Sequence, residues 1–280
     1  MERKKAFGTK RKIIWLSLGA AVILLAALAL DSRLLVQRYT IRAEKITAPV
    51  RLALVTDLHS CKYGENQQEL IRAVEEAEPD MVLLGGDIFD DQLPPRNTEV
   101  FLQAIAAKYP CYYVAGNHEY WAGKEAFASM EAFMKSCGIR ILKGDVERVA
   151  VKGQVLYICG ADDPDNFDHL PMEMQLESMK RSTAEDGYTV LLSHRPEYFD
   201  LYTEYGFDLA LCGHAHGGQW RIPFLINGVY TPDQGLFPEW AGGFYQKENT
   251  TMVVSRGLAR ESTSIPRIFN RPELVVADLQ

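Results

Sequence analysis

The sequence predicts an α/β protein in which strands and helices alternate around a sheet. Three observations support this fold class. Short apolar runs recur along the chain, segments with helical periodicity separate them, and each run stops at a residue type that binds metal ions. Because sites in open α/β sheets form at the carboxyl ends of strands, we expect these terminal residues to gather in one place. The runs are VTDLHS, MVLLGGD, CYYVAGNHE, TVLLSH and FDLALCGHAH.

The first run carries Asp57 and His59, two positions apart. In an extended backbone, residues i and i+2 project to the same side, so both side chains can converge on one point. A carboxylate and an imidazole so placed can hold a metal ion. Five of the six histidines fall at such run ends, which favours a common site over unrelated core histidines. The later runs end at Asp87, Asn117, His118, His194, His214 and His216.

The bulk composition limits the classes of function. A chain of 280 residues suits one domain with a full core, which we expect over residues 49–280, after a connector at 33–48 in which a strand is one interpretation. The net charge of −7 and the lack of a basic stripe argue against a nucleic-acid partner. The five cysteines form no CxxC pair, so we expect Cys61 and Cys212, beside the candidate ligands, to pack rather than bind metal.

Residues 1–32 predict a basic leader and a membrane anchor. The leader precedes an uncharged run from Ile13 to Leu30 that, at 1.5 Å rise per residue, can just cross a bilayer core. Basic residues ahead of the run place the amino end inside, so we expect an extracytoplasmic domain at the cell membrane. A cleaved signal peptide is the alternative, because Ala27 and Ala29 have the spacing that a signal peptidase prefers.

The remaining segments predict structural elements. Helical periodicity indicates helices around 70–77, 100–105 and 127–134, with Gly138 as a C-cap, and residues 139–160 indicate short strands joined by turns. We expect the acidic stretch ADDPDNFD and His169 to form a solvated loop, with a loop at the mouth of the site as the alternative. The aromatic segment 219–248 predicts hairpins packed on the sheet; an apolar rim for a lipid-like substrate or for the membrane is the alternative.

The series DLH, GGD, GNHE, SH and GHAH resembles, in order and spacing, that of the calcineurin-like metallophosphoesterase family, from about Arg51 to the end of the chain. The resemblance implies an αββα sandwich with mixed sheets and a metal-dependent phosphoric ester hydrolase. The extended GHAHGGQ, the anchor, and the SRG and PEL elements are similar to the membrane-associated bacterial branch of the family. That branch includes enzymes similar to the UDP-2,3-diacylglucosamine pyrophosphohydrolases.

The resemblance also implies two divalent metal ions, for which Mn, Fe and Zn suit the donor types equally. Asp87 would bridge them, because ions about 3.5–4 Å apart need a shared carboxylate, and a bridging hydroxide would attack the phosphorus. The first ion would be held by Asp57, His59, Asp87 and His216, and the second by Asp87, Asn117, His194 and His214.

His118 follows Asn117 directly and, in an extended backbone, would point the other way. We therefore expect it to reach over the substrate and protonate the leaving oxygen, with a structural bond to Glu119 as the alternative.

These features together predict a dinuclear-metal phosphoesterase that hydrolyses a phosphodiester or pyrophosphate bond, in a lipid-linked or membrane-proximal substrate, as a monomer. A phosphomonoesterase and a non-catalytic metal-binding protein on the same fold are the alternatives. The sequence contains neither GxxxxGK[ST] nor GxSxG, which excludes P-loop nucleotide chemistry and a serine hydrolase elbow.

Overall fold

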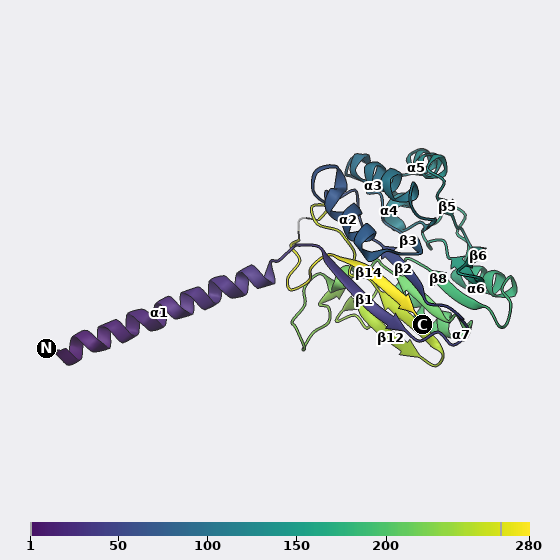
Figure 1. Ribbon diagram of the computed structural model, residues 1–280. Coiled ribbons are helices and arrows are strands. Elements are labelled where there is room, and N and C mark those ends of the chain that lie inside the picture. Colours follow the sequence, from purple (N-terminus) through teal and green to yellow (C-terminus); the bar gives the residue numbers. More distant parts are fainter. Residues whose placement is uncertain (1, 264) are drawn as a thin grey trace.

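Two six-stranded sheets lie face to face at the centre of the domain (Figure 1). The computed structural model describes residues 2–263 and 265–280, and side chains from residue 14 onward. Sheet A has the order β1 (Leu35–Ile41), β14 (Glu273–Leu279), β2 (Val50–Val55), β3 (Met81–Gly85), β4 (Cys111–Val114), β5 (Arg140–Ile141). Sheet B has the order β12 (Gly243–Lys247), β13 (Thr250–Val254), β9 (Leu209–Cys212), β8 (Tyr188–Leu192), β7 (Gln154–Gly160), β6 (Asp145–Val151).

Both sheets are mixed, as expected. In sheet A, β2, β3, β4 and β5 pair in parallel and β14 runs antiparallel to β2; in sheet B, β13, β9, β8 and β7 pair in parallel between two antiparallel edge strands. The parallel strands place their carboxyl ends at one edge of each sheet.

Helices cover the outer faces of both sheets and complete the αββα sandwich. Because side chains alternate along a strand, Leu52 and Leu54 of β2 pack between the sheets, while Ala53 and Val55 pack under the helices. On sheet A these helices are α2 (Gln68–Ala77), α3 (Arg96–Ala106) and α5 (Lys124–Ser136), and on sheet B α6 (Met172–Arg181) and α7 (Phe199–Glu204).

The local sequence signals are largely confirmed. The three predicted helices correspond to α2, α3 and α5, and Gly138 follows the last with a φ of 79°. One of the turns predicted within residues 139–160, at Gly153, joins β6 to β7. Cys61 and Cys212 are buried in the apolar clusters, as expected of packing residues. The predicted connector 33–48 contains β1, which pairs in parallel with β14, so this stretch contributes an edge strand to sheet A.

The aromatic segment 219–248 departs in part from its prediction. β12 joins sheet B, and Trp240 packs edge-on against Phe199 and Tyr245. The part before it does not pack on the sheet, because β10 (Tyr230–Thr231) and β11 (Gly235–Leu236) pair only with each other and Phe224 and Phe237 are exposed. The spacing of apolar residues in the sequence does not show whether a turn buries an aromatic side chain or directs it into solvent.

The helix α1 (Glu2–Ala29) leaves the domain and extends away from it (Figure 1). The side chains of the predicted basic leader and of Ile13 lie outside the described residues. From Ile14 onward the apolar side chains of α1 are exposed, Leu16 to 74% and Ile23 to 72%. Searching the described residues identifies no helix with both the length and the apolar character that a membrane crossing requires.

A buried ion pair fixes the start of β14 and yields a stability prediction. Glu273 is fully buried and accepts hydrogen bonds from the backbone N–H of Arg256, at 2.8 Å, and from its Nε, at 2.6 Å. Glu273→Ala leaves the guanidinium without its partner, and we expect the free energy of unfolding to fall by about 3–5 kcal/mol. Urea unfolding of the full chain in mild detergent measures this.

Glu44→Ala is the matched control. Its pair with Arg42 is exposed on both sides, so removing it should change the free energy of unfolding by no more than about 1 kcal/mol. Equal effects of the two substitutions would contradict the structural role of Glu273.

Candidate metal centre

The loops that follow β2 and β3 run side by side beyond the strand ends. The backbone N–H of Asp57 donates to the carbonyl oxygen of Gly86 at 3.0 Å, and that of His59 donates to the carbonyl oxygen of Asp87 at 2.9 Å. These bonds continue the parallel pairing of the two strands past their ends. They bring the first two candidate ligands next to the third.

The backbone at these positions is left-handed. Asp57, His59 and Asp87 have φ of 51°, 46° and 50°, and His214 and His216 have φ of 63° and 46°. The extended backbone assumed for Asp57 and His59 is therefore wrong, because both lie beyond the end of β2, where the chain turns sharply. Their side chains nevertheless converge. Non-glycine residues in this region are uncommon and strained, and such strain concentrates at functional sites.

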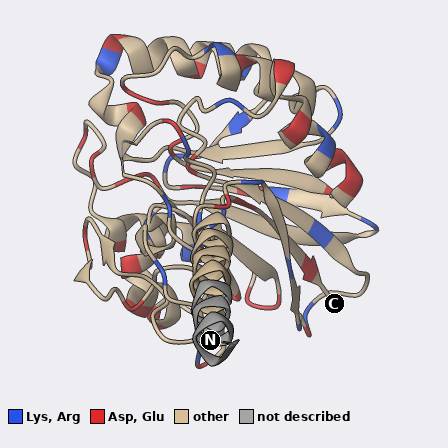
Figure 2. Ribbon diagram, turned by 90° about the vertical axis from the view of Figure 1, so that its left-hand side faces the viewer, with Lys and Arg blue, Asp and Glu red and all other residues tan. Residues whose placement is uncertain are grey.

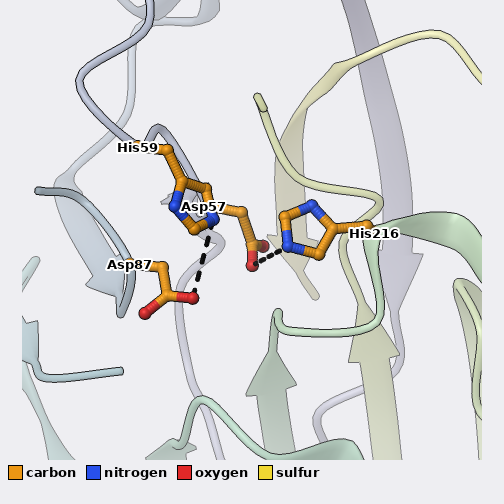
Figure 3. A group of neighbouring side chains, drawn as sticks. All are labelled: Asp57, His59, Asp87 and His216. Atoms are coloured by element: carbon orange, nitrogen blue, oxygen red, sulfur yellow. Dashed lines mark ion pairs between the residues drawn. The ribbon is translucent and has the colours of Figure 1, made fainter. Parts of the chain in front are cut away.

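Asp57, His59, Asp87 and His216 form the first group, with one ligand atom of each within 4.8 Å of the others (Figure 3). His59 Nε2 lies 3.6 Å from Asp87 Oδ2, and His216 Nε2 lies 3.5 Å from Asp57 Oδ1. These separations are too long for hydrogen bonds. They suit ligands of one ion, since two atoms each about 2.1 Å from a metal lie about 3–3.5 Å apart.

Asp87, His194 and His214 form the second group. His194 Nε2 lies 3.1 Å from Asp87 Oδ2 and 3.2 Å from His214 Nδ1. The same oxygen of Asp87 thus faces His59 in the first group and His194 in the second, as expected of a carboxylate that bridges two ions through one oxygen. Asn117 is buried at the start of the short helix α4 (Asn117–Trp121), whose second residue donates its backbone N–H to Asp87 Oδ1 at 2.9 Å.

Four buried polar atoms of the site lack a partner, and this tests whether the residues fit metal ions. They find no hydrogen bond anywhere in the described part of the chain. A buried polar group without a partner costs about 1–3 kcal/mol, a cost that a bound cation removes. Carboxylate and amide oxygens with imidazole nitrogens suit divalent Mn, Fe or Zn, so the donor set fits. The four atoms are Asp57 Oδ2, His59 Nε2, Asp87 Oδ2 and Asn117 Oδ1.

The charges within the site also favour cations. Burial opposes the ionised form of Asp87, yet the facing histidines, His194 first among them, hold the pKa of its carboxyl well below the ordinary value. Burial likewise opposes the imidazolium of His194, but Asp87 and Asp57 raise its pKa to about 10. Burial lowers the pKa of His216 to about 3, which keeps a lone pair available. A metal ion would take the place of the proton on His194.

Each of three candidate histidine ligands is oriented by a partner on its other ring nitrogen. His59 Nδ1 donates to Asp90 Oδ2 at 3.0 Å, and His214 Nε2 donates to Asp233 Oδ2 at 2.5 Å. His194 Nδ1 donates to the carbonyl oxygen of Gly85 at 2.9 Å. Such partners fix the tautomer and leave the second nitrogen for a metal.

Sequence reasoning missed Asp90 and Asp233. Asp90 is an acidic residue only three positions after Asp87, which was a sequence signal for it. Nothing in the aromatic segment indicated Asp233.

The acidic loop is partly buried beside the candidate ligand His194, so its prediction as a solvated loop is wrong. Asp163 is buried and accepts two hydrogen bonds from Arg195, from Nε at 2.6 Å and from Nη2 at 2.9 Å. Arg195 follows His194 in the chain, and its Nη1 also donates to Asp233 at 2.6 Å. The charge of the arginine compensates the burial of the loop, a contact that the local sequence does not encode. His169 is exposed, as expected.

His118 lines an open pocket of about 270 Å³ beside His59 and His216. Its orientation does not come from an extended backbone, because residues 117 and 118 form the first turn of α4. Its Nδ1 donates to Asp91 Oδ1 at 2.6 Å, and this carboxylate, not Glu119, is its partner. Asp91 thereby fixes the tautomer and leaves Nε2 outside this bond.

Glu119 ties the loops of the site together. Its buried carboxylate accepts hydrogen bonds from four backbone N–H groups, and burial and the nearby Asp87 raise its pKa to about 7. These donors belong to the loop that follows β3 and to the turn before α4. The side chain thus holds the backbone of both segments in place. The donors are Asp87, Ile88, Phe89 and Gly116.

Close contacts between these segments require glycine. A Cβ at Gly86, whose φ is 89°, would lie 2.6 Å from His194 Nδ1, and one at Gly116 would lie 2.3 Å from Asp87 Oδ1. Both contacts are impossible, so glycine allows the backbone to approach the ligands.

Glu119→Gln should weaken the hydrogen bonds that hold the loop after β3 and the turn before α4 in place. The amide offers one acceptor oxygen and turns an NH₂ group toward backbone donors, so at least one donor loses its partner, at a cost of about 1–3 kcal/mol. We expect lower thermal stability together with reduced metal content, measured by calorimetry and by elemental analysis. Glu125→Gln, at an exposed position in the first turn of α5, is the control and should change neither. Unchanged metal content in Glu119→Gln would contradict this role.

A family model described as calcineurin-like phosphoesterase matches residues 50–218. The uncharacterized metallophosphoesterase YkuE of Bacillus subtilis is 26% identical over 239 residues, which cover 82% of this chain and 79% of that protein. The phosphodiesterase YaeI of Escherichia coli is 28% identical over 236 residues, which cover 83% of each chain. The chain spans 55–59% of the length of three longer curated relatives.

The fold is similar to that of GAP50, described as the anchor in the inner membrane complex of Plasmodium. The two share a TM-score of 0.51 at 12% identity, covering 83% of this chain and 81% of that one. At this identity the likeness concerns the fold alone.

Proposed function

This chain belongs to the calcineurin-like phosphoesterase family, and from that premise we propose that it hydrolyses a phosphodiester or pyrophosphate bond in a lipid-linked or membrane-proximal substrate. It is a metal-dependent phosphoric ester hydrolase that uses two divalent ions. The observation that carries the proposal is the position of Asp87 Oδ2 between the two groups of candidate ligands. The name of the phosphodiesterase relative supports diester hydrolysis.

In this proposal Asp87 is shared by the two ions. When bound, the ions make a water molecule nucleophilic near neutral pH and neutralise charge on the phosphate oxygens. The carboxylates of Asp57 and Asp87 neutralise only two of the four positive charges of the two ions. The site therefore keeps an excess of positive charge that attracts an anionic substrate. Asp57, His59, Asp87 and His216 would hold the first ion, and Asp87, Asn117, His194 and His214 would hold the second.

His118 supplies the proton for the leaving oxygen. It lies at the pocket, outside both ligand sets, and Asp91 holds its Nδ1. A proton on Nε2 can then pass to the oxygen as the bond to phosphorus breaks. Asp91 acts through His118 and is a positioning residue.

The membrane-proximal part of the proposal rests on α1. Its apolar side chains from Ile14 to Leu28 are exposed, with no domain surface covering them in the described residues. A helix that is apolar on all sides is stable where lipid or protein covers it. We propose that α1 lies in the bilayer and that the domain lies outside the cytoplasm. We also propose that the enzyme is a monomer.

Hydrolysis of bis-p-nitrophenyl phosphate by the full chain in detergent with Mn²⁺ tests the activity. Turnover that disappears on chelation and returns with Mn²⁺ is the expected result. Two bound ions without turnover of this diester, of pyrophosphates or of phosphomonoesters would refute catalysis and leave a metal-binding protein.

Asp87→Asn should weaken the binding of both ions, because one carboxylate serves both groups. We expect fewer than two ions per chain and a loss of activity of more than about 100-fold, which exceeds the effect of removing a residue that only supports a ligand. Elemental analysis with activity measures this. Asp168→Asn, in the exposed part of the acidic loop, is the control. Retention of two ions by Asp87→Asn would refute the bridge.

His118→Asn should lower kcat by about 10²–10⁴-fold while both ions stay bound, because the residue donates a proton and is not a ligand. Asp91→Asn should lower kcat less and change the pH profile of kcat, since it acts on the tautomer of His118. Steady-state kinetics alongside metal analysis separate the two roles. Metal lost together with activity in His118→Asn would mean that the residue serves as a ligand.

A further inference from the structure

Five aliphatic or phenylalanine side chains project into solvent from the segment between the metal centre and β12. Leu225 is 82% exposed, Leu236 is 70% exposed, and Phe224 is fully exposed. Phe224 and Phe237 have left-handed φ of 67° and 55°, so tight turns present them outward. A monomeric soluble domain rarely exposes such a group, and apolar clusters of this kind mark interaction surfaces. We call these residues the apolar edge: Ile222, Phe224, Leu225, Leu236 and Phe237.

The apolar edge is joined to the end of α1 through one intervening segment. The backbone N–H of Arg221 donates to the carbonyl oxygen of Ile268 at 2.9 Å, and the backbone N–H of Phe269 donates to the carbonyl oxygen of Ala29 at 2.7 Å. In Figure 1 the loop that carries the edge lies on the side of the domain from which α1 departs, and Figure 2 views that side along α1. The edge and the apolar helix therefore belong to one side of the molecule.

The active-site pocket is built from the same segments. Gln219, at the start of the segment that bears the edge, lines the pocket together with His118. Ser262 and Thr263 form another part of its wall, close in sequence to Ile265, which is itself 52% exposed. Two of the segments that line the pocket therefore also carry exposed apolar side chains.

We propose that the apolar edge is a second membrane contact, which inserts into the interface of the bilayer that holds α1 and turns the pocket toward the lipid headgroups. The inference rests on the membrane anchoring proposed above. The occupant is lipid because the neighbouring α1 exposes apolar side chains on all sides, a surface that a bilayer covers. Aromatic and leucine side chains on a protein surface bind the boundary between headgroups and acyl chains. The substrate class that fits is an amphiphile whose phosphodiester or pyrophosphate group lies at the bilayer surface.

Tryptophan quenching by brominated lipid tests the contact without reference to catalysis. The full chain is reconstituted in vesicles of phosphatidylcholine and phosphatidylglycerol whose acyl chains carry bromine. Phe224→Trp should add emission that the bromine quenches. Met174→Trp, at an exposed position on α6, is the matched control and should add emission that is not quenched. Unquenched added emission from both variants would overturn the proposal.

A pair of substrates with the same leaving group tests the consequence for catalysis. We expect Phe224→Ser combined with Leu225→Ser to lower hydrolysis of phosphatidyl-p-nitrophenol in vesicles about tenfold, with hydrolysis of soluble bis-p-nitrophenyl phosphate unchanged. Unchanged rates on both substrates, or equal losses on both, would overturn the proposal.

Two further outcomes are separable. The chain could associate with itself in lipid-free detergent, and the double substitution could abolish that association. If bromine in vesicles then quenches no added emission, the edge is a contact with a second copy of the chain, and the membrane contact is overturned. Parent protein that hydrolyses neither substrate would refute the proposed function, while the quenching comparison would still decide the membrane contact.

Discussion

The carboxylate of Asp87 is the constraint on which the site depends. One oxygen accepts the backbone N–H of His118, and the other, which lacks a hydrogen-bond partner among the described residues, faces His59 on one side and His194 on the other. A buried, ionised oxygen between imidazoles on both sides is stable when cations compensate it. Two divalent cations, one held by each group of candidate ligands, would supply this compensation.

The fold supplies the rigidity that this arrangement requires. Left-handed turns and buried charges oppose folding locally, so they persist only where surrounding packing determines them. Two sheets buried on both faces hold the strand ends, and Glu119 fastens the loop after β3 to the turn before α4. Partners such as Asp90 then fix the orientation of the imidazole rings, so the ligands are already oriented before an ion binds.

The pocket connects this chemistry to the exterior of the domain. His118 and Gln219 both line the pocket, and Gln219 begins the segment that carries the apolar edge and that pairs with the segment contacting α1. The aromatic segment has a second role in the centre, because Asp233 within it orients His214. One stretch of chain thus contributes to the metal centre, to the pocket and to the surface proposed to meet lipid.

The sequence by itself determined the α/β class, the main helices and the candidate ligand residues, because strand and helix periods are local and each candidate follows an apolar strand. The tertiary structure alone decided the left-handed turn at Asp57, the helical position of His118, the burial of Asp163 against Arg195, and the exposure of Phe224. Each of these depends on which distant segments pack together, and no local period carries that information.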